Sequence, residues 1–193
     1  MLSYKESLKI LKETNAILEG HFILSSGLHS NQYIQCAKLL SHPKQAEIIC
    51  NSLSKKIKKN FKKIDTILSP AIGGIVVGYE IGRQLSLKTI FAEKVNDILT
   101  LRRGFDILEN SNVLIIEDVI TTGKSALACS QIIKEQKANL VGYACIIDRS
   151  DESLVIKDKI ISEVKFKIKT FKGSELPEDL KKIPPIKPGS QSL

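Results

Sequence analysis

Two kinds of hydrophobic pattern alternate along the chain. In the stretch that Pro43 opens, apolar residues recur at the spacing of one helical face: Ala46, Ile49, Cys50, Leu53 and Ile57. The same spacing returns over residues 75–85 and 125–136, where Ala126, Cys129, Ile132 and Ile133 share one side. These three segments are predicted to be helices.

Between the predicted helices lie short runs rich in β-branched residues, at 65–70, 89–92, 113–116 and 140–147. The run at 113–116 is continuously apolar, which is typical of a strand buried on both faces of a parallel sheet. Strands and helices therefore alternate. This order predicts an α/β fold with a central, mainly parallel sheet flanked by helices.

Two segments interrupt the alternation. Residues 95–104 carry polar and glycine residues between strand-like flanks, and we expect a long, mobile excursion there. Residues 177–193 contain four prolines, which predict an extended terminal segment rather than more core. We therefore expect one domain over residues 1–193, with no internal repeat.

Composition is that of an ordinary globular protein. The 193 residues are 42% hydrophobic and 26% charged, and no apolar stretch is long enough to cross a bilayer. The first residues mix charges early and do not resemble a secretory signal, so we expect a cytoplasmic protein without a membrane partner. The net charge of +8 suits either a nucleic acid or a small polyanionic substrate and alone does not choose between them, but much of it lies in lysine runs typical of solvated faces, so we expect no nucleic-acid partner.

The four cysteines lie far apart, without a C-x-x-C pair or a histidine at zinc-ligand spacing. We interpret Cys36, Cys50, Cys129 and Cys145 as reduced, structural residues. No protein metal cage is predicted from the cysteines or from the three histidines.

The candidate chemistry follows the predicted strand at 113–116. Residues 117–125 read EDVITTGKS and run directly into a predicted helix, at the sheet edge where parallel strands bind ligands. Thr121, Thr122 and Ser125 offer hydroxyls, Gly123 permits a tight turn, and the amides of a helix N-terminus favour a phosphate. Glu117 and Asp118 add two carboxylates for ribose hydroxyls or a hydrated Mg²⁺.

Two other interpretations of this loop were weighed. Asp118 and Thr122 could simply cap the following helix, which is the common role of such residues. Alternatively, Gly123-Lys124-Ser125 matches the end of a Walker A loop, but that motif needs a glycine at position 118, which is Asp. A nucleoside triphosphatase is therefore not expected.

Residues 115–125 (IIEDVITTGKS) resemble the phosphoribosyl diphosphate motif of type I phosphoribosyltransferases, and more narrowly of the orotate-specific branch. Further matches run along the chain, at 21–30 (HFILSSGLHS), 69–74 (SPAIGG), 100–105 (TLRRGF), 147–149 (IDR) and 187–190 (KPGS). The resemblance implies transfer of phosphoribose to orotate, giving orotidine 5′-phosphate in pyrimidine synthesis. It also implies a small N-terminal hood over about residues 1–40, an extended segment over about 175–193, and a homodimer.

The resemblance also implies roles for residues. Glu117, Asp118, Val119, Ile120, Thr121, Thr122, Gly123, Lys124 and Ser125 would bind the phosphoribosyl diphosphate. Asp118 and Lys94 would be catalytic, and Lys94 and Arg102 would also contact the diphosphate from a mobile loop, near Arg103, that closes over the neighbouring subunit's site. Thr121 and Arg149 would bind orotate. Mg²⁺ would act as cofactor, mainly on the diphosphate, so that no protein metal ligand is certain.

Some assignments stay open. Relatives in other branches carry several lysines in the mobile loop and one near position 25, whereas this chain has Ser25 and one loop lysine. Tyr33 could stack on the base or be a core aromatic, and residues 71–74 would lie under the diphosphate. The alternatives to an orotate enzyme are a purine phosphoribosyltransferase, and a non-catalytic regulator that binds phosphoribosyl diphosphate and a nucleic acid.

Overall fold

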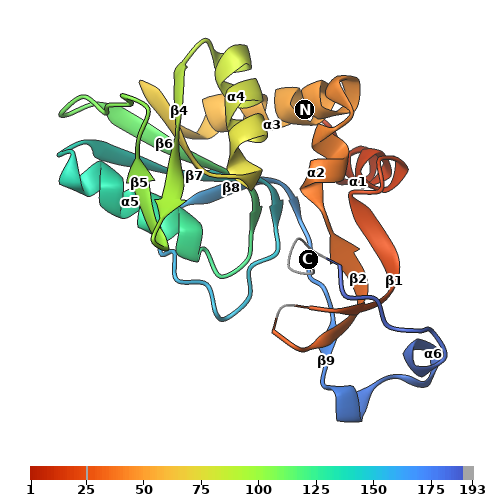
Figure 1. Cartoon of the computed structure of the whole chain (residues 1–193). Coiled ribbons are helices and arrows are strands. Elements are labelled where there is room, and N and C mark those ends of the chain that lie inside the picture. The colour runs from red at the N-terminus through yellow and green to blue at the C-terminus, as the bar shows by residue number, and fades with distance from the viewer. Residues whose placement is uncertain (25, 189–193) are drawn as a thin grey trace.

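A six-stranded sheet forms the centre of the molecule (Figure 1). The computed structural model describes residues 1–24 and 26–188. The strands follow the order β5-β4-β3-β6-β7-β8, all parallel except β5, which runs antiparallel to β4. Their bounds are β3 (Thr66–Pro70), β4 (Lys88–Val95), β5 (Ile98–Leu101), β6 (Asn112–Ile120), β7 (Asn139–Asp148) and β8 (Ile160–Lys165). The predicted α/β class and mainly parallel sheet are confirmed.

Helices cover both faces of this sheet. One face carries α1 (Tyr4–Glu13), α2 (Cys36–Leu40), α3 (Pro43–Asn60) and α4 (Gly73–Leu85), and the other carries α5 (Lys124–Glu135). Neighbouring strand residues point into different cores: Ile67 packs with the first group and Leu68 with α5. Both are fully buried, so the continuous apolar runs have the double burial that the sequence predicted.

A second, smaller sheet lies beside the first (Figure 1). It contains β1 (Ile17–Ile23), β2 (His29–Ile34) and β9 (Thr170–Phe171), all antiparallel neighbours. A short helical turn, α6 (Glu178–Lys181), precedes a parallel bridge between Phe22 and Ile186. The predicted extended segment thus contains one turn of helix, and its residues 189–193 lie outside the described residues, as does Ser25.

Residues 95–104 form a regular hairpin and a short turn, so the expectation of a long irregular excursion there is wrong, whereas its mobility stays a prediction. Strand β4 continues to Val95, the chain reverses at Asn96 and Asp97, and β5 pairs back from Ile98 to Leu101. Asn96 and Asp97 have φ of 47° and 63°, the left-handed pair of a two-residue hairpin turn. Because Asn and Asp tolerate this conformation better than most residues, the sequence closes a regular hairpin.

Strand β6 is also longer than predicted. It continues past Ile116 to Ile120, because β7 runs beside it and pairs with Glu117, Val119 and Ile120. The acidic pair therefore belongs to the strand, and only Thr121 to Gly123 form the turn before α5. The irregular part of the candidate loop is therefore shorter than the sequence suggested.

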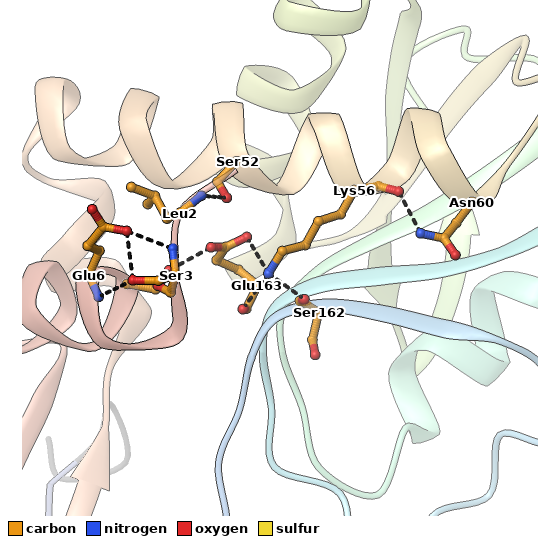
Figure 2. Close-up of polar contacts among 9 residues, drawn as sticks. Leu2, Ser3, Glu6, Ser52, Lys56, Asn60, Ser162 and Glu163 are labelled. Carbon is orange, nitrogen blue, oxygen red and sulfur yellow. Dashed lines mark hydrogen bonds and ion pairs between the residues drawn. The ribbon is translucent and has the colours of Figure 1, made fainter.

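A buried acidic residue joins α1, α3 and β8 (Figure 2). Glu163 of β8 is 3% exposed, and its Oε2 lies 3.0 Å from Nζ of Lys56. The Ser7 hydroxyl donates to Oε1 at 2.6 Å, and Lys56 also donates to the Glu163 carbonyl at 2.8 Å. Oε1 thus accepts a hydrogen bond, while Oε2 has the Lys56 ammonium as its ion partner but no hydrogen bond among the described residues, and the cluster links α1 and α3 to the strand at the edge of the sheet.

The remaining sequence predictions concern cysteines and membranes. All four cysteines are free and buried, as predicted, and burial raises the pKa of Cys50 and of Cys129 to about 12. In the described residues, no helix is both long and apolar enough to span a bilayer.

Candidate active site

The turn between β6 and α5 presents an uncapped helix N-terminus. Gly123 occupies the N-cap position with φ of 76°, and a Cβ there would lie 2.7 Å from Cδ1 of Ile156. Within residues 1–24 and 26–188, no side chain caps α5, and its first turn has no acidic residue. The interpretation of Asp118 or Thr122 as helix caps is therefore wrong. The first amides of α5 remain available to an external anion.

A small hollow of about 70 Å³ opens over these amides. It is lined by Glu117 and by residues 119–125, which include the three hydroxyl side chains of Thr121, Thr122 and Ser125. The Val155 amide donates to the Thr122 carbonyl at 2.9 Å, which fixes the turn from the β7–β8 connection. The structure thus brings Glu117 and residues 119–125 together, as the sequence predicted.

Asp118 lies against the start of α4. A Cβ on Gly73 would come within 2.8 Å of its Oδ1, so a larger residue at position 73 would displace this carboxylate. Oδ1 accepts from the Val119 amide at 2.9 Å. Residues 71–74 are expected to lie under the diphosphate, and this contact places Gly73 beside the candidate site. In the structure, however, the space left by the missing side chain of Gly73 is taken by the Asp118 carboxylate.

The acidic pair is poorly compensated. Glu117 is 9% exposed, and burial together with the neighbouring Asp118 charge raises its pKa to about 8. Burial also raises the pKa of Asp118. No lysine or arginine forms an ion pair with either carboxylate among the residues that the structure describes. Such a pair, left without cations, suits a ligand that supplies hydroxyl donors or positive charge.

The donor set fits Mg²⁺ only when a substrate completes the coordination. No group of three or more Asp, Glu, His or Cys residues converges in the described part of the chain. Mg²⁺ is commonly held by one or two carboxylates together with substrate phosphates and waters. Glu117 and Asp118 provide two such carboxylates beside an anion-binding turn, so they fit this mode.

Arg149 lies next to the same sheet edge. It follows β7, and its amide donates to the Ile120 carbonyl at 2.8 Å. Its side chain lines a cavity of about 870 Å³ together with residues 150–154, Lys165 and Lys167. Burial lowers the pKa of Arg149, while Asp151 and then Tyr33 act in the opposite direction. In the described residues its guanidinium makes no hydrogen bond or ion pair within the protein, which leaves it available to an anion in the cavity.

The predicted loop cations lie elsewhere. Lys94 and Arg102 are exposed on the β4–β5 hairpin, and no contact joins either of them to residues 117–125 within the described chain. Arg103 pairs with Glu93, at 2.9 Å from Nε to Oε1, and lies 5.8 Å from the Phe91 ring centre. A single subunit therefore does not assemble the complete set of predicted site residues.

Tyr33 of β2 packs on another aromatic ring. Its centroid lies 5.7 Å from that of Phe22, and the residue is partly exposed. The contact gives Tyr33 a structural role, while its partial exposure leaves part of the ring accessible.

Sequence reasoning missed an apolar surface beside Asp118. Ile72, Val76 and Tyr79 are 85%, 52% and 65% exposed along one side of α4 and the residue before it. A groove of about 290 Å³ runs from there to α2 and is lined by Ala37, Leu40, Ser41, Ile72, Gly73, Val76 and Asp118. The i, i+4, i+7 spacing was visible in the sequence, but it could not show which face of α4 is uncovered.

Comparisons with known proteins agree with this site. A family model described as "Phosphoribosyl transferase domain" matches residues 37–179. An orotate phosphoribosyltransferase of Caldicellulosiruptor bescii is 44% identical over 184 residues, covering 95% of this chain and 96% of the relative. One from a Thermoanaerobacter species is 41% identical over 98% of both chains. The chain therefore belongs to the phosphoribosyltransferase family, and these two relatives carry the name orotate phosphoribosyltransferase.

Solved structures share the fold. The crystal structure of orotate phosphoribosyltransferase from Aeropyrum pernix matches with a TM-score of 0.67 and 20% identity, over 82% of this chain and 92% of that chain. Adenine phosphoribosyltransferase from Thermoanaerobacter pseudethanolicus matches with a TM-score of 0.61 and 18% identity, over 70% and 88%. Because both kinds of enzyme share this architecture, the fold alone does not select the base.

Proposed function

We propose that this protein is an orotate phosphoribosyltransferase. It transfers the phosphoribosyl group of 5-phosphoribosyl 1-diphosphate to orotate, giving orotidine 5′-phosphate and diphosphate in pyrimidine synthesis. The observation that carries the proposal is the uncapped N-terminus of α5 beside the unpaired carboxylates of Glu117 and Asp118. The names and the high coverage of the relatives support the choice of orotate.

The small hollow and the larger cavity each bind a different part of the substrates. The 5′-phosphate occupies the small hollow at residues 119–125, where amides and hydroxyls donate to its oxygens. Glu117 and Asp118 accept from the ribose hydroxyls. Orotate occupies the larger cavity, where the guanidinium of Arg149 pairs with its carboxylate, with Thr121 at the boundary between the two.

The reaction exchanges one bond at the sugar for another. A ring nitrogen of orotate forms a bond to C1 of the ribose while the bond from C1 to the diphosphate oxygen breaks. Positive charge develops on the sugar, and the Asp118 carboxylate stabilises it. The ring nitrogen loses its proton as the new bond forms, and the departing diphosphate oxygen, which becomes basic as its bond to C1 breaks, can accept that proton. Mg²⁺, held by the diphosphate with Glu117 or Asp118, would neutralise charge on the leaving group.

A homodimer would complete the site. Lys94 and Arg102 do not reach residues 117–125 within one subunit, and the exposed apolar side of α4 begins beside Asp118. A second copy of the chain on this surface would cover Ile72, Val76 and Tyr79 and bring the β4–β5 hairpin of one subunit toward the site of the other. Lys94 would then act on the departing diphosphate. The four free, buried cysteines suit the reducing cytoplasm.

The deciding experiment incubates the purified protein with phosphoribosyl diphosphate, Mg²⁺ and one base at a time: orotate, adenine or hypoxanthine. Loss of orotate absorbance with release of diphosphate is expected, and the purines should remain unchanged. Turnover of a purine in place of orotate would establish the purine alternative. Ligand binding without turnover of any base, together with salt-dependent binding of RNA or DNA, would establish the regulator.

A further inference from the structure

Asp148, the last residue of β7, is a buried carboxylate outside the proposed substrate contacts. It is 5% exposed, and it directly precedes Arg149. Burying a carboxylate is costly, and a negative charge beside an anion-binding arginine weakens the attraction for an anion. Its presence therefore calls for a physical role that outweighs both effects.

The contacts of Asp148 surround Arg149 on both sides. Its carbonyl accepts from the Phe166 amide at 2.8 Å, which fixes the chain before Arg149. Its Oδ1 accepts from the Ser150 amide at 2.9 Å, which fixes the chain after Arg149 in the two-residue turn typical of Asp. The Arg149 amide itself donates to the Ile120 carbonyl at 2.8 Å. Three consecutive residues are thus held at the ends of β6, β7 and β8.

Lys165 compensates the buried charge. Its Nζ lies 3.2 Å from Oδ2 of Asp148, and the two residues are register partners in β7 and β8. The Lys165 side chain is 63% exposed while that of Asp148 is 7% exposed, so the lysine reaches in from the surface. Because this ion pair neutralises Asp148, the free guanidinium of Arg149 keeps its attraction for an anion in the cavity.

We propose that Asp148 is a positioning residue that orients Arg149 toward the base, with Lys165 as its counter-ion. The proposal rests on the proposed function. The orientation of Arg149 depends on the hydrogen bond from the Ser150 amide to Oδ1 of Asp148, and not on the negative charge of Asp148. An arginine without other protein contacts depends on its backbone for its direction, so loss of that acceptor should weaken binding of the base and leave phosphoribosyl diphosphate largely unaffected.

Two substitutions separate geometry from charge. Asp148→Asn removes the charge but keeps an oxygen that can accept from Ser150, so the KM for orotate should stay within about threefold of the unmodified protein. Asp148→Glu keeps the charge for Lys165 but places the carboxylate one methylene away, so the KM for orotate should rise about tenfold or more. The KM for phosphoribosyl diphosphate should change less than about twofold in both.

A double-mutant cycle tests the route through Arg149. Asp148→Ala and Arg149→Ala should each raise the KM for orotate, and the double variant should be no worse than Arg149→Ala alone, because Asp148 then has nothing to orient. The proposal would be contradicted if the two single-variant increases in the KM for orotate multiplied in the double variant. It would also be contradicted if Asp148→Ala raised the KM for orotate and the KM for phosphoribosyl diphosphate equally. Asp106→Ala serves as the matched control, since it removes an exposed ion pair with Lys88, the first residue of β4.

The outcomes distinguish this inference from the proposed function. KM does not depend on how much of a variant is folded, and Asp148→Glu remains informative if Asp148→Ala fails to fold. Should the unmodified protein not use orotate, the proposed function fails. Should it use orotate while Asp148→Glu and Asp148→Ala behave like the unmodified protein, only the positioning role fails.

Discussion

Glu163 and Glu117 are both buried glutamates in parallel strands of one sheet, yet their surroundings are opposite. Glu163 lies 3.0 Å from the Lys56 ammonium (Figure 2) and accepts from the Ser7 hydroxyl at 2.6 Å. Glu117 has a second carboxylate, Asp118, as its neighbour in sequence, and burial with that charge raises its pKa to about 8. The first carboxylate has its partners within the fold, and the second lacks them.

This difference separates a structural acid from a functional one. A buried charge with a partner is compatible with stability, whereas an unpaired one costs free energy that the rest of the fold must supply. Proteins retain such costs where a ligand meets the group, and Glu117 lines the hollow that we assign to the phosphoribosyl group. Removing either glutamate should therefore affect different properties of the protein.

The largest effect is expected at Asp118. Asp118→Asn should lower kcat about hundredfold or more, because the neutral amide does not stabilise positive charge on the ribose. The thermal midpoint should not fall, since Asp118 has no ion partner in the described chain to lose and burial raises the pKa of its carboxylate. Steady-state kinetics with orotate and calorimetry measure the two properties. A near-normal kcat in correctly folded protein would remove Asp118 from the mechanism.

Glu163→Gln should have the reverse signature. It leaves Lys56 without its buried partner, and we expect the free energy of unfolding to fall by about 3 kcal/mol, with kcat per folded molecule unchanged. Denaturant unfolding measures the first quantity and titrated active sites the second. A variant as stable as the unmodified protein would show that the cluster in Figure 2 contributes nothing net.

Glu117→Gln should stabilise the ligand-free protein. The pKa of Glu117 is raised in the folded state, so the folded protein holds its proton more tightly and loses stability, relative to the unfolded chain, as pH rises from about 4.5 to about 8. Gln has no charge to bury, so the variant should gain up to about 4 kcal/mol at pH 8 and almost nothing near pH 4.5. Unfolding at both pH values tests this; a gain independent of pH would contradict it.

The smallest effect marks the baseline for the comparison. Glu178 and Lys181 form an exposed pair at 2.6 Å, with side chains 81% and 51% exposed. Glu178→Gln should shift the thermal midpoint by about 1 °C or less, because solvent screens such pairs. A loss as large as that of Glu163→Gln would mean that burial does not distinguish the two pairs.

Periodicity and motif together predicted the central sheet and the binding turn. The apolar run at 113–116 indicated a strand buried on both faces, and EDVITTGKS after it predicted the turn that leads into the uncapped N-terminus of α5. The sequence also carried a signal that was overlooked: Ser3 and Glu6 form a capping box at the start of α1, and this spacing is recognisable without a structure. Local chemistry of this kind can be predicted.

Partners distant in sequence could not be predicted. The residues next to Glu163 in sequence do not indicate that Lys56 and Ser7 contact it, since both come from other elements. The β4–β5 hairpin was missed because Asn96-Asp97 is a weaker turn signal than Asn-Gly, and its left-handed φ values follow from pairing along β5. Lys94 and Arg102 do not reach residues 117–125 within one subunit, so the roles proposed for them require the proposed dimer.

The small sheet has a consequence for the order of folding during synthesis. Its strands β1 and β2 leave the ribosome early, but β9 and Ile186, which pair with them, emerge only after the whole central sheet. Pairing between segments so far apart in sequence is slow. The nascent chain can therefore assemble its parallel central sheet before β9 and Ile186 pair with β2 and β1. Chaperones that shield exposed strand edges would therefore meet residues 17–34 for longer than any other paired segment.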